Sequence, residues 1–372
     1  MSSTARFTAL DVFRGMTVCF MIIVNVPGDY STTYAPLLHA QWNGFTVTDL
    51  VFPSFLFAVG NAMSFATGKW SGMEQQEVLG KIIKRTMLIF LLGYLLHWIP
   101  ELDESNHYEL ISFSTVRILG VLQRIALAYC LASLLIYYCK PKALLITCGL
   151  ALLGYWGILL LFGEAGAELT MAGNAVRKLD LWLIGPRHMP DTGGIAFEAQ
   201  GWLGTLPAMV NAVAGFFAGQ FIRKKGKTYE GLAKLLLAGF TLFAIACIWD
   251  LGFPINKKLW TSSFVLYTVG LDCMIIACII FVIDFLGKTK WTYFFEVFGK
   301  NPLFIYILSE LGAHLVYGIN ISNGQPVSNW LMRHIFQHAG MYLGSLLFAT
   351  CFMLLCWTVG WWMDMRKIYV RV

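Results

Sequence analysis

The chain has 372 residues, of which 58% are hydrophobic and only 13% are charged, and its mean hydropathy is +0.65. Soluble domains usually carry about 25% charged residues, so this composition excludes an ordinary soluble protein and predicts an integral membrane protein. The net charge of +6 does not indicate nucleic acid as a partner, because membrane proteins gather Lys and Arg in their cytoplasmic loops.

Ten segments are apolar over about the 20 residues that a helix needs to cross a bilayer. The sequence therefore predicts an all-α, polytopic fold in which residues 1–372 form a single transmembrane domain. The first segment lacks a small-residue cleavage site and is expected to be a membrane helix rather than a removed signal peptide. The ten segments are 8–27, 46–67, 81–99, 115–138, 142–162, 202–222, 231–251, 261–286, 301–319 and 341–363.

Connections rich in Lys and Arg alternate along the chain with connections that have few or none. This pattern predicts the orientation of the chain in the membrane. The loop 28–45 has no Lys or Arg, and the loop 100–114 has four acids and no base. Since cytoplasmic loops carry the excess of Lys and Arg, both termini are expected in the cytoplasm and these two loops on the outer side. The basic clusters comprise Lys69, Lys81, Lys84, Arg85, Lys140, Lys142, Arg223, Lys224, Lys225, Lys227, Lys288, Lys290, Arg366, Lys367 and Arg371.

The outward loop 163–201 is too long for a simple connection, and loops of this length are usually functional or disordered. Trp182, Phe197 and Trp202 in or beside it predict an ordered cap. Metal chemistry is not predicted. His334 and His338 have the i, i+4 spacing of a metal pair, but no third ligand accompanies them.

A polar cluster, "LLHAQWNGFTVTDLVFPSF" at 37–55, precedes the second apolar segment. His39 is suited to proton transfer near neutral pH, and Asp49 could fix its tautomer as a carboxylate does in a hydrolytic triad. Asn25 ends the first segment on the same side. In the alternative interpretation His39 is an interfacial polar residue and Asp49 is a helix N-cap. The residues leave the role of His39 open and favour capping for Asp49.

Four basic residues in or near apolar segments are candidates for binding an anionic ligand. Arg117 and Arg124 are seven positions apart, which predicts one face of a helix; a structural ion pair is the alternative for the buried guanidinium. Lys257 and Lys258 are expected on the outer side, against the positive-inside trend. This exception to the trend indicates a functional role for them. Asp272, in the following segment, is a further candidate partner for an internal base.

Several blocks of rare residues in fixed order carry a family resemblance. In chain order they are "LDVFRGMTVCFMIIVNVPG", "HAQWNGFTVTDLVFPSFLFAVG", "RILGVLQRIALAY", "GWLGTLPAMVN", "PINKKLWTSSFVLYTVG", "GKNPLFIYILSE" and "RKIYV". They resemble the heparan-α-glucosaminide N-acetyltransferase family of transmembrane acyltransferases nearly from end to end. The chain lacks the extra lumenal N-terminal region of the lysosomal enzyme, so a bacterial relative in the cytoplasmic (inner) membrane is expected.

The resemblance implies acetyl transfer from cytosolic acetyl-CoA to the amino group of a glucosamine-type sugar on the periplasmic side. The histidine of the HAxWNG motif, here His39, is then catalytic. Asn25 corresponds to the asparagine of the VN motif, and Asp49 to the aspartate of the DLVFP motif. One departure matters, because relatives tend to carry an acidic residue before the glycine of the GTLPA block, where this chain has Gln200; Glu198 could substitute for it.

The remaining predicted roles follow from this mechanism. Acetyl-CoA is the co-substrate, no metal is involved, and the partners are a small glycan acceptor, membrane lipid and, as relatives suggest, a second copy in a homodimer. An O-acyltransferase acting on a polysaccharide hydroxyl and a sugar or anion transporter are the alternative functions. The residues expected to bind acetyl-CoA are Arg117, Arg124, Lys257 and Lys258, and those expected to bind the sugar are Trp42, Glu198 and Trp202.

Overall fold

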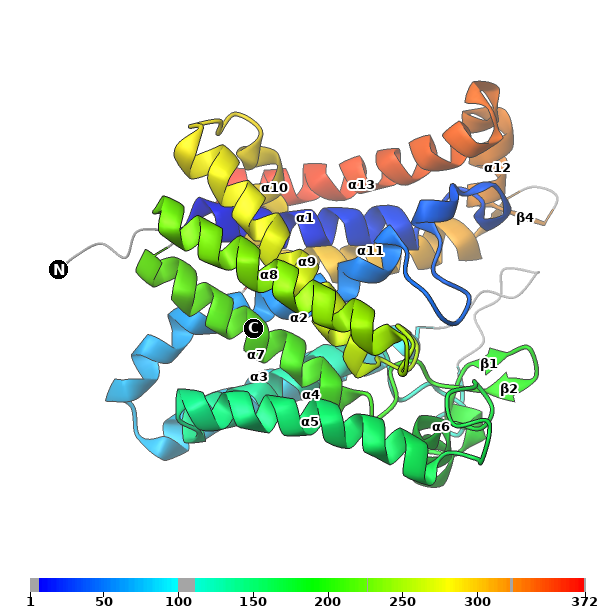
Figure 1. Ribbon diagram of the computed structural model, residues 1–372. Helices are drawn as coiled ribbons and strands as arrows, with labels where there is room; N and C mark the ends of the chain where they lie inside the picture. The colour runs from blue at the N-terminus through cyan, green and yellow to red at the C-terminus, as the bar shows by residue number, and fades with distance from the viewer. Residues whose placement is uncertain (1–6, 100–110, 226, 322–323, 371–372) are drawn as a thin grey trace.

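The computed structural model describes residues 7–99, 111–225, 227–321 and 324–370. Within these residues the fold is almost entirely helical, and most of the long helices run alongside one another (Figure 1). The helices are α1 Thr8–Asn25, α2 Val47–Ala66, α3 Gln75–His97, α4 Val121–Tyr138, α5 Pro141–Phe162, α6 Ala175–Leu183, α7 Thr205–Lys225, α8 Tyr229–Asp250, α9 Ser262–Ile280, α10 Thr292–Lys300, α11 Pro302–Gly318, α12 Val327–His334 and α13 Met341–Met365. Two short antiparallel hairpins pair β1 Asp191–Thr192 with β2 Ile195–Ala196, and β3 Asn320–Ile321 with β4 Gln325–Pro326.

Each of the ten predicted segments contains a helix, and the prediction of a multi-pass helical membrane protein is confirmed. Among the described residues, eight helices are long and apolar enough to cross a membrane. The predicted number of ten is not reached by this criterion. The helix α3 carries Lys81, Lys84 and Arg85 in its first half, and α11 has only 17 residues. The eight are α1, α2, α4, α5, α7, α8, α9 and α13.

The helices α2 and α7 pack closely, with glycines facing the opposite backbone. A Cβ atom on Gly60 would come within 1.8 Å of the Ala212 carbonyl oxygen, and one on Gly215 within 2.0 Å of the Phe57 carbonyl oxygen. Small residues at such interfaces let membrane helices approach until their backbones touch. This contact fixes α2, the helix that begins beside His39, against the centre of the bundle.

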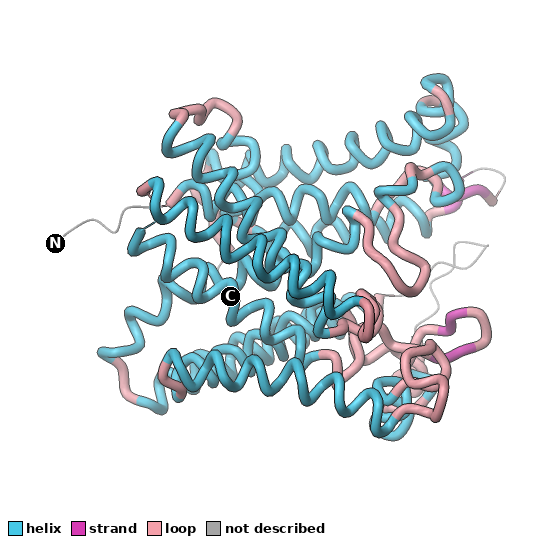
Figure 2. Tube along the Cα trace, in the orientation of Figure 1, coloured by secondary structure: helices cyan, strands magenta, loops and turns pink. Residues whose placement is uncertain are grey.

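Loops join the helices at both ends of the bundle (Figure 2). The loop that contains His39 packs against the segment 163–204 through Trp42 and Phe197. The segment 163–204 contains α6 and the β1–β2 hairpin and has its own small core, in which Val176 and Phe197 pack against Tyr155 and Leu259. Phe197 is therefore buried, but Trp182 is 80% exposed and contributes nothing to this core. Residues 100–110 of the acidic loop used to predict the orientation lie outside the described residues.

The α2–α7 contact predicts that substitution by alanine changes the unfolding temperature differently at two glycines. We expect Gly60→Ala to lower the thermal unfolding temperature of the detergent-purified protein, because overpacking typically costs roughly 1–3 kcal/mol. Gly149→Ala on α5 is the matched control, since an added Cβ there meets nothing within 4 Å. Alanine is the better helix former by about 1 kcal/mol, so the control should be unchanged or slightly stabilised. Equal unfolding temperatures for the two variants would contradict the packing argument.

Candidate active site

The side chain of Asp49 organises the His39 region. Asp49 lies in the first turn of α2, where its Oδ2 accepts hydrogen bonds from the backbone N–H groups of Thr46 and Ala40, both at 3.1 Å. Its Oδ1 lies 2.7 Å from Nδ1 of His39. The two interpretations of Asp49 are therefore compatible, because one carboxylate oxygen caps the helix while the other holds the imidazole.

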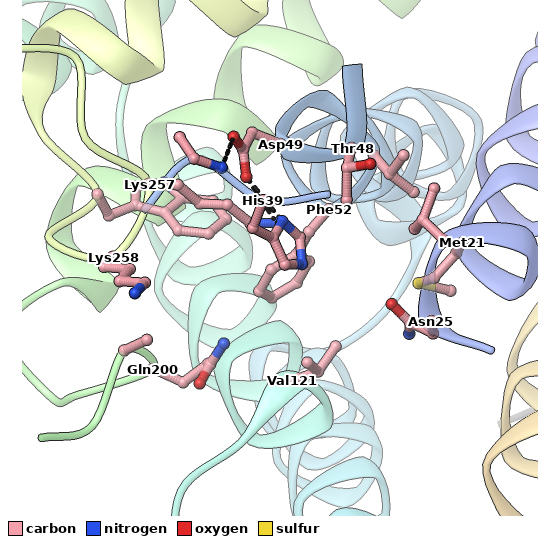
Figure 3. A pocket seen from close by; sticks show the side chains of 15 residues that line it. Met21, Asn25, His39, Thr48, Asp49, Phe52, Val121, Gln200, Lys257 and Lys258 are labelled. Carbon is pink, nitrogen blue, oxygen red and sulfur yellow. Dashed lines mark hydrogen bonds and ion pairs between the residues drawn. The ribbon is translucent and has the colours of Figure 1, made fainter. Parts of the chain in front are cut away.

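The contact with Asp49 determines which nitrogen of His39 carries a proton. An ionised carboxylate can only accept hydrogen bonds, so Nδ1 of His39 must donate. The neutral ring then keeps an unshared electron pair on Nε2, which lies on the side of the ring away from Asp49 (Figure 3). This is the orientation that a general base or a nucleophilic imidazole requires.

Lys257 completes a triad of charged and polar groups with these two residues. Its Nζ lies 3.1 Å from Nδ1 of His39 and 3.5 Å from Oδ1 of Asp49. Burial lowers the pKa of Lys257 to about 8, an effect that the negative charge of Asp49 opposes. Burial also lowers the pKa of His39 below its ordinary value, and the Lys257 cation lowers it further, whereas the hydrogen bond that His39 donates to Asp49 opposes this effect. At neutral pH the site therefore holds a neutral imidazole beside a lysine cation.

These groups border a cavity of about 170 Å³. His39 and Lys257 lie on one side of it, and Asn25, at the end of α1, lies on the opposite side (Figure 3). Gln200, which stands where relatives tend to have an acidic residue, also reaches this space. The cavity is lined by Met21, Val24, Asn25, His39, Ala40, Thr48, Asp49, Val51, Phe52, Val121, Ala199, Gln200, Lys257, Lys258 and Trp260.

Trp42 connects the His39 loop to the 163–204 segment. Its Nε1 donates to the Leu169 carbonyl oxygen at 2.8 Å, and its ring meets that of Phe197 edge-on at 5.5 Å. Lys258 donates to the Gln41 carbonyl oxygen at 2.8 Å and lies 5.9 Å from the centre of the Trp42 ring. Trp42 does not line the cavity, so the contacts of this predicted sugar-binding residue are with the protein itself.

The prediction that Arg117 and Arg124 share a helix face is wrong. The helix α4 begins at Val121, after extended backbone at Gly120, and Arg117 lies in the irregular segment before it. Arg117 instead forms a two-pronged ion pair with Glu198, with both N–O distances at 2.8 Å, and also donates to Gln200 at 2.8 Å. A residue predicted to bind the cofactor and one predicted to bind the substrate therefore pair with each other.

Arg124 is fully buried, in the first turn of α4 and at the same end of the bundle as His39. Its Nη2 donates to the Gly201 carbonyl oxygen at 2.8 Å, and its guanidinium lies 5.1 Å from the centre of the Trp260 ring. Trp202, which follows Gly201 in the chain, donates its backbone N–H to Asp180 at 3.0 Å. Burial raises the pKa of Asp180 to about 7, and this hydrogen bond opposes the rise. Arg124 and Trp202 therefore hold the 200–204 segment in place.

Two other candidates lie away from the cavity. Asp272 is buried within α9 and accepts a hydrogen bond of 2.5 Å from Ser54, so it does not contact His39. His334 contacts the Trp330 carbonyl oxygen through Nδ1 at 2.9 Å. No group of three or more potential metal ligands occurs in the part of the chain that the structure describes.

Comparison with known proteins places this site in a family. The model of the family described as "Heparan-alpha-glucosaminide N-acetyltransferase, catalytic" matches residues 6–239. The chain belongs to this family. The matched region contains Asn25, His39, Asp49 and the Arg117–Glu198 pair, whereas Lys257 lies beyond it. The predicted resemblance is thus confirmed, and the protein is a multi-pass member of an acyltransferase family.

Two curated relatives extend the match. The heparan-alpha-glucosaminide N-acetyltransferase of Mus musculus is 28% identical over 370 residues, which cover 83% of this chain and 54% of the relative. The enzyme of the same name from Homo sapiens is 28% identical over 368 residues, with 82% and 53% covered. The chain therefore spans about half the length of the curated relatives that it matches.

Sequence reasoning missed Glu310 on α11. Its Oε1 lies 3.5 Å from Nδ2 of Asn25, one of the residues that line the cavity. The available signal was an acidic residue inside an apolar stretch, which in a membrane protein is a functional candidate by default.

The position of Lys257 predicts a measurable effect on His39. Removing the cation in Lys257→Met should raise the pKa of the His39 imidazole, because a nearby positive charge disfavours protonation. Histidine NMR titration of the detergent-solubilised protein measures this pKa without any substrate. Lys258→Met is the matched control and should have a smaller effect, because Lys258 Nζ is held by the Gln41 carbonyl. An unchanged His39 pKa in Lys257→Met would show that the two groups are not coupled.

Proposed function

We propose that the protein transfers an acetyl group from acetyl-CoA to the amino group of a glucosamine-type sugar. The observation that carries the proposal is the His39–Asp49 pair, which leaves Nε2 of the imidazole available at a cavity. Membership of the family supports acyl transfer, and the names of the two relatives supply the reaction and the sugar class. His39, Asp49, Asn25 and Lys257 are the proposed catalytic group.

The proposed membrane arrangement separates the two substrates. The CoA phosphates are too highly charged to cross lipid, so CoA would bind at the cytoplasmic end while the sugar arrives from the periplasm. The His39 cavity lies at one end of the bundle, and the basic last turn of α7 lies at the other (Figure 1). By the positive-inside rule the basic end faces the cytoplasm of a bacterial inner membrane. Charge-assisted bonds from its Lys and Arg side chains would suit the phosphates.

Two chemical routes use the same geometry. In the first, Nε2 of His39 removes a proton from the sugar amine while its nitrogen attacks the thioester carbonyl. In the second, Nε2 itself accepts the acetyl group and passes it to the amine. Both require a neutral ring held by Asp49. Lys257 and the amide of Asn25 are placed to donate to the oxyanion that develops on the carbonyl oxygen.

The transporter alternative would use Arg124 and His39 as pathway residues. It loses support at Arg124, which is buried and bound to the Gly201 carbonyl. A homodimer and binding of membrane lipid remain proposals. Exposed apolar side chains on α5, such as Leu150 and Leu153, form a face suited to lipid.

Substitution of His39 tests the proposed function. We expect His39→Ala to lower acetyl transfer from acetyl-CoA to glucosamine by about 10²–10⁴-fold, the usual contribution of a general acid–base group. Asp49→Asn should reduce turnover as well, because the ring loses the group that fixes its tautomer. Product formed per minute by purified protein is the measurement, with thermal unfolding as a control for folding. The exposed His338 provides the matched control variant, His338→Ala. Near-normal turnover in His39→Ala would remove the histidine from the chemistry.

The pKa values at the site predict the pH profile of kcat/KM. Because burial lowers the pKa of His39, the neutral imidazole persists into acid, and activity should fall only below the ordinary histidine range. Activity should fall again near pH 8, where Lys257 loses its charge. Deprotonation of an amine acceptor in solution would affect the wild type and Lys257→Arg alike. Lys257→Arg keeps the cation at high pH and should remove the alkaline decline; a decline that persists there would exclude Lys257 as its cause.

A further inference from the structure

We propose that Glu310 binds the ammonium group of the acceptor, next to Asn25, and takes its first proton. This inference rests on the proposed function, since it names the group that recognises an amine rather than a hydroxyl. Glu310 lies on α11, outside the residues matched by the family model.

The position of Glu310 links it to the cavity through one residue. Asn25 lines the cavity opposite His39 (Figure 3). Its Nδ2 lies 3.5 Å from Oε1 of Glu310. This distance is at the outer limit of a hydrogen bond. A carboxylate offers about four acceptor positions. A donor held between Asn25 and Glu310 would therefore meet a carboxylate with capacity to accept further hydrogen bonds.

The charges of the other carboxylates near the cavity are already balanced. Asp49 is paired with Lys257 and hydrogen-bonded to His39, and Glu198 is paired with Arg117. Glu310 belongs to no ion pair within 4.0 Å among the described residues, although Arg117 and His314 lie within electrostatic range of it. Tyr306 and Asn25 hydrogen-bond to Glu310 without neutralising its charge, so this carboxylate near the cavity can still pair with a cationic ligand.

The two lysines on the His39 side of the cavity explain why an ammonium acceptor needs a carboxylate without a counter-ion. Lys257 and Lys258 both border the cavity beside His39, so a positively charged acceptor is repelled from that wall and attracted to the wall at Asn25, next to which Glu310 lies. The charge distribution therefore favours initial binding of the ammonium group beside Asn25, and the neutral amine reaches Nε2 of His39 across the cavity after it has lost its first proton. A hydroxyl acceptor would gain nothing from this arrangement, because it carries no charge.

The proton balance assigns one step to each titratable group. The sugar ammonium gives its first proton to Glu310 and becomes a neutral amine. The amine nitrogen then forms a bond to the thioester carbonyl carbon, the carbon–sulfur bond breaks, and Nε2 of His39 takes the second proton and gives it to the departing thiolate. Glu310 releases its proton to solvent. The products are the acetamido sugar, CoA with a free thiol, and one proton.

The test compares an amine with a neutral hydroxyl analogue. Glucosamine and glucose binding to the full-length purified protein are measured by calorimetry, and acetyl transfer to glucosamine is measured in parallel. Glu310→Gln should weaken glucosamine binding and raise its KM by roughly tenfold or more, the usual effect of losing a charged hydrogen-bond partner. Glucose binding and the KM for acetyl-CoA should be unchanged. The matched control is Glu164→Gln, which removes an exposed negative charge from the 163–204 segment.

Glu310→Asp decides the question if the glutamine variant does not fold. It keeps the charge but draws it back from Asn25, so its KM for glucosamine should rise above that of the wild type while glucose binding stays unchanged. Unchanged preference for glucosamine over glucose in the folded variants would overturn the Glu310 assignment while leaving acetyl transfer intact. Glutamate-dependent glucosamine binding without any acetylated product would instead support the site and refute the proposed reaction.

Discussion

One carboxylate, that of Asp49, couples the fold of this protein to its candidate chemistry. A charge that is almost completely buried is costly unless hydrogen bonds and a counter-ion compensate it. Asp49 meets this requirement with two backbone N–H groups on Oδ2, and with His39 and Lys257 on Oδ1. The start of α2, the path of the preceding loop and the orientation of the imidazole are therefore fixed together. Moving any one of them would leave part of the carboxylate unsatisfied.

The groups around His39 come from segments that are far apart in the chain. Lys257 is separated from His39 by 218 positions, and Arg117 from Glu198 by 81. Such loops are ordered only if they bond to one another, which is the role of the Arg117–Glu198 pair and of the Trp42–Leu169 hydrogen bond. The rigid α2–α7 contact supports this layer from within the bundle. Loops positioned by a rigid scaffold are the usual carriers of function.

The sequence predicted the parts of this arrangement that depend on local patterns. Apolar length gave a helix in every predicted segment, and a ten-residue separation was enough to associate His39 with Asp49. The pairing of Arg117 with Glu198 could not be predicted, because it depends on how two distant loops meet. The spacing argument for Arg117 and Arg124 failed because it assumed an unbroken helix, whereas the extended backbone at Gly120 ends the periodicity. Glu310 could have been singled out as an acidic residue within an apolar stretch, but only the structure shows that it lies beside Asn25.

The two lysines that the sequence predicts on the outer side, against the positive-inside trend, have a structural explanation in this site. Without Lys257, the buried Asp49 would lack a cation, and the cost of an unpaired buried charge is large. An arginine would supply the charge but would remain protonated and demand several acceptors for its planar group. A lysine is a compact charge whose pKa responds to burial, here reaching about 8. It can therefore balance Asp49 while keeping the adjacent imidazole neutral, so the requirement of the fold and the requirement of the chemistry are met by the same residue.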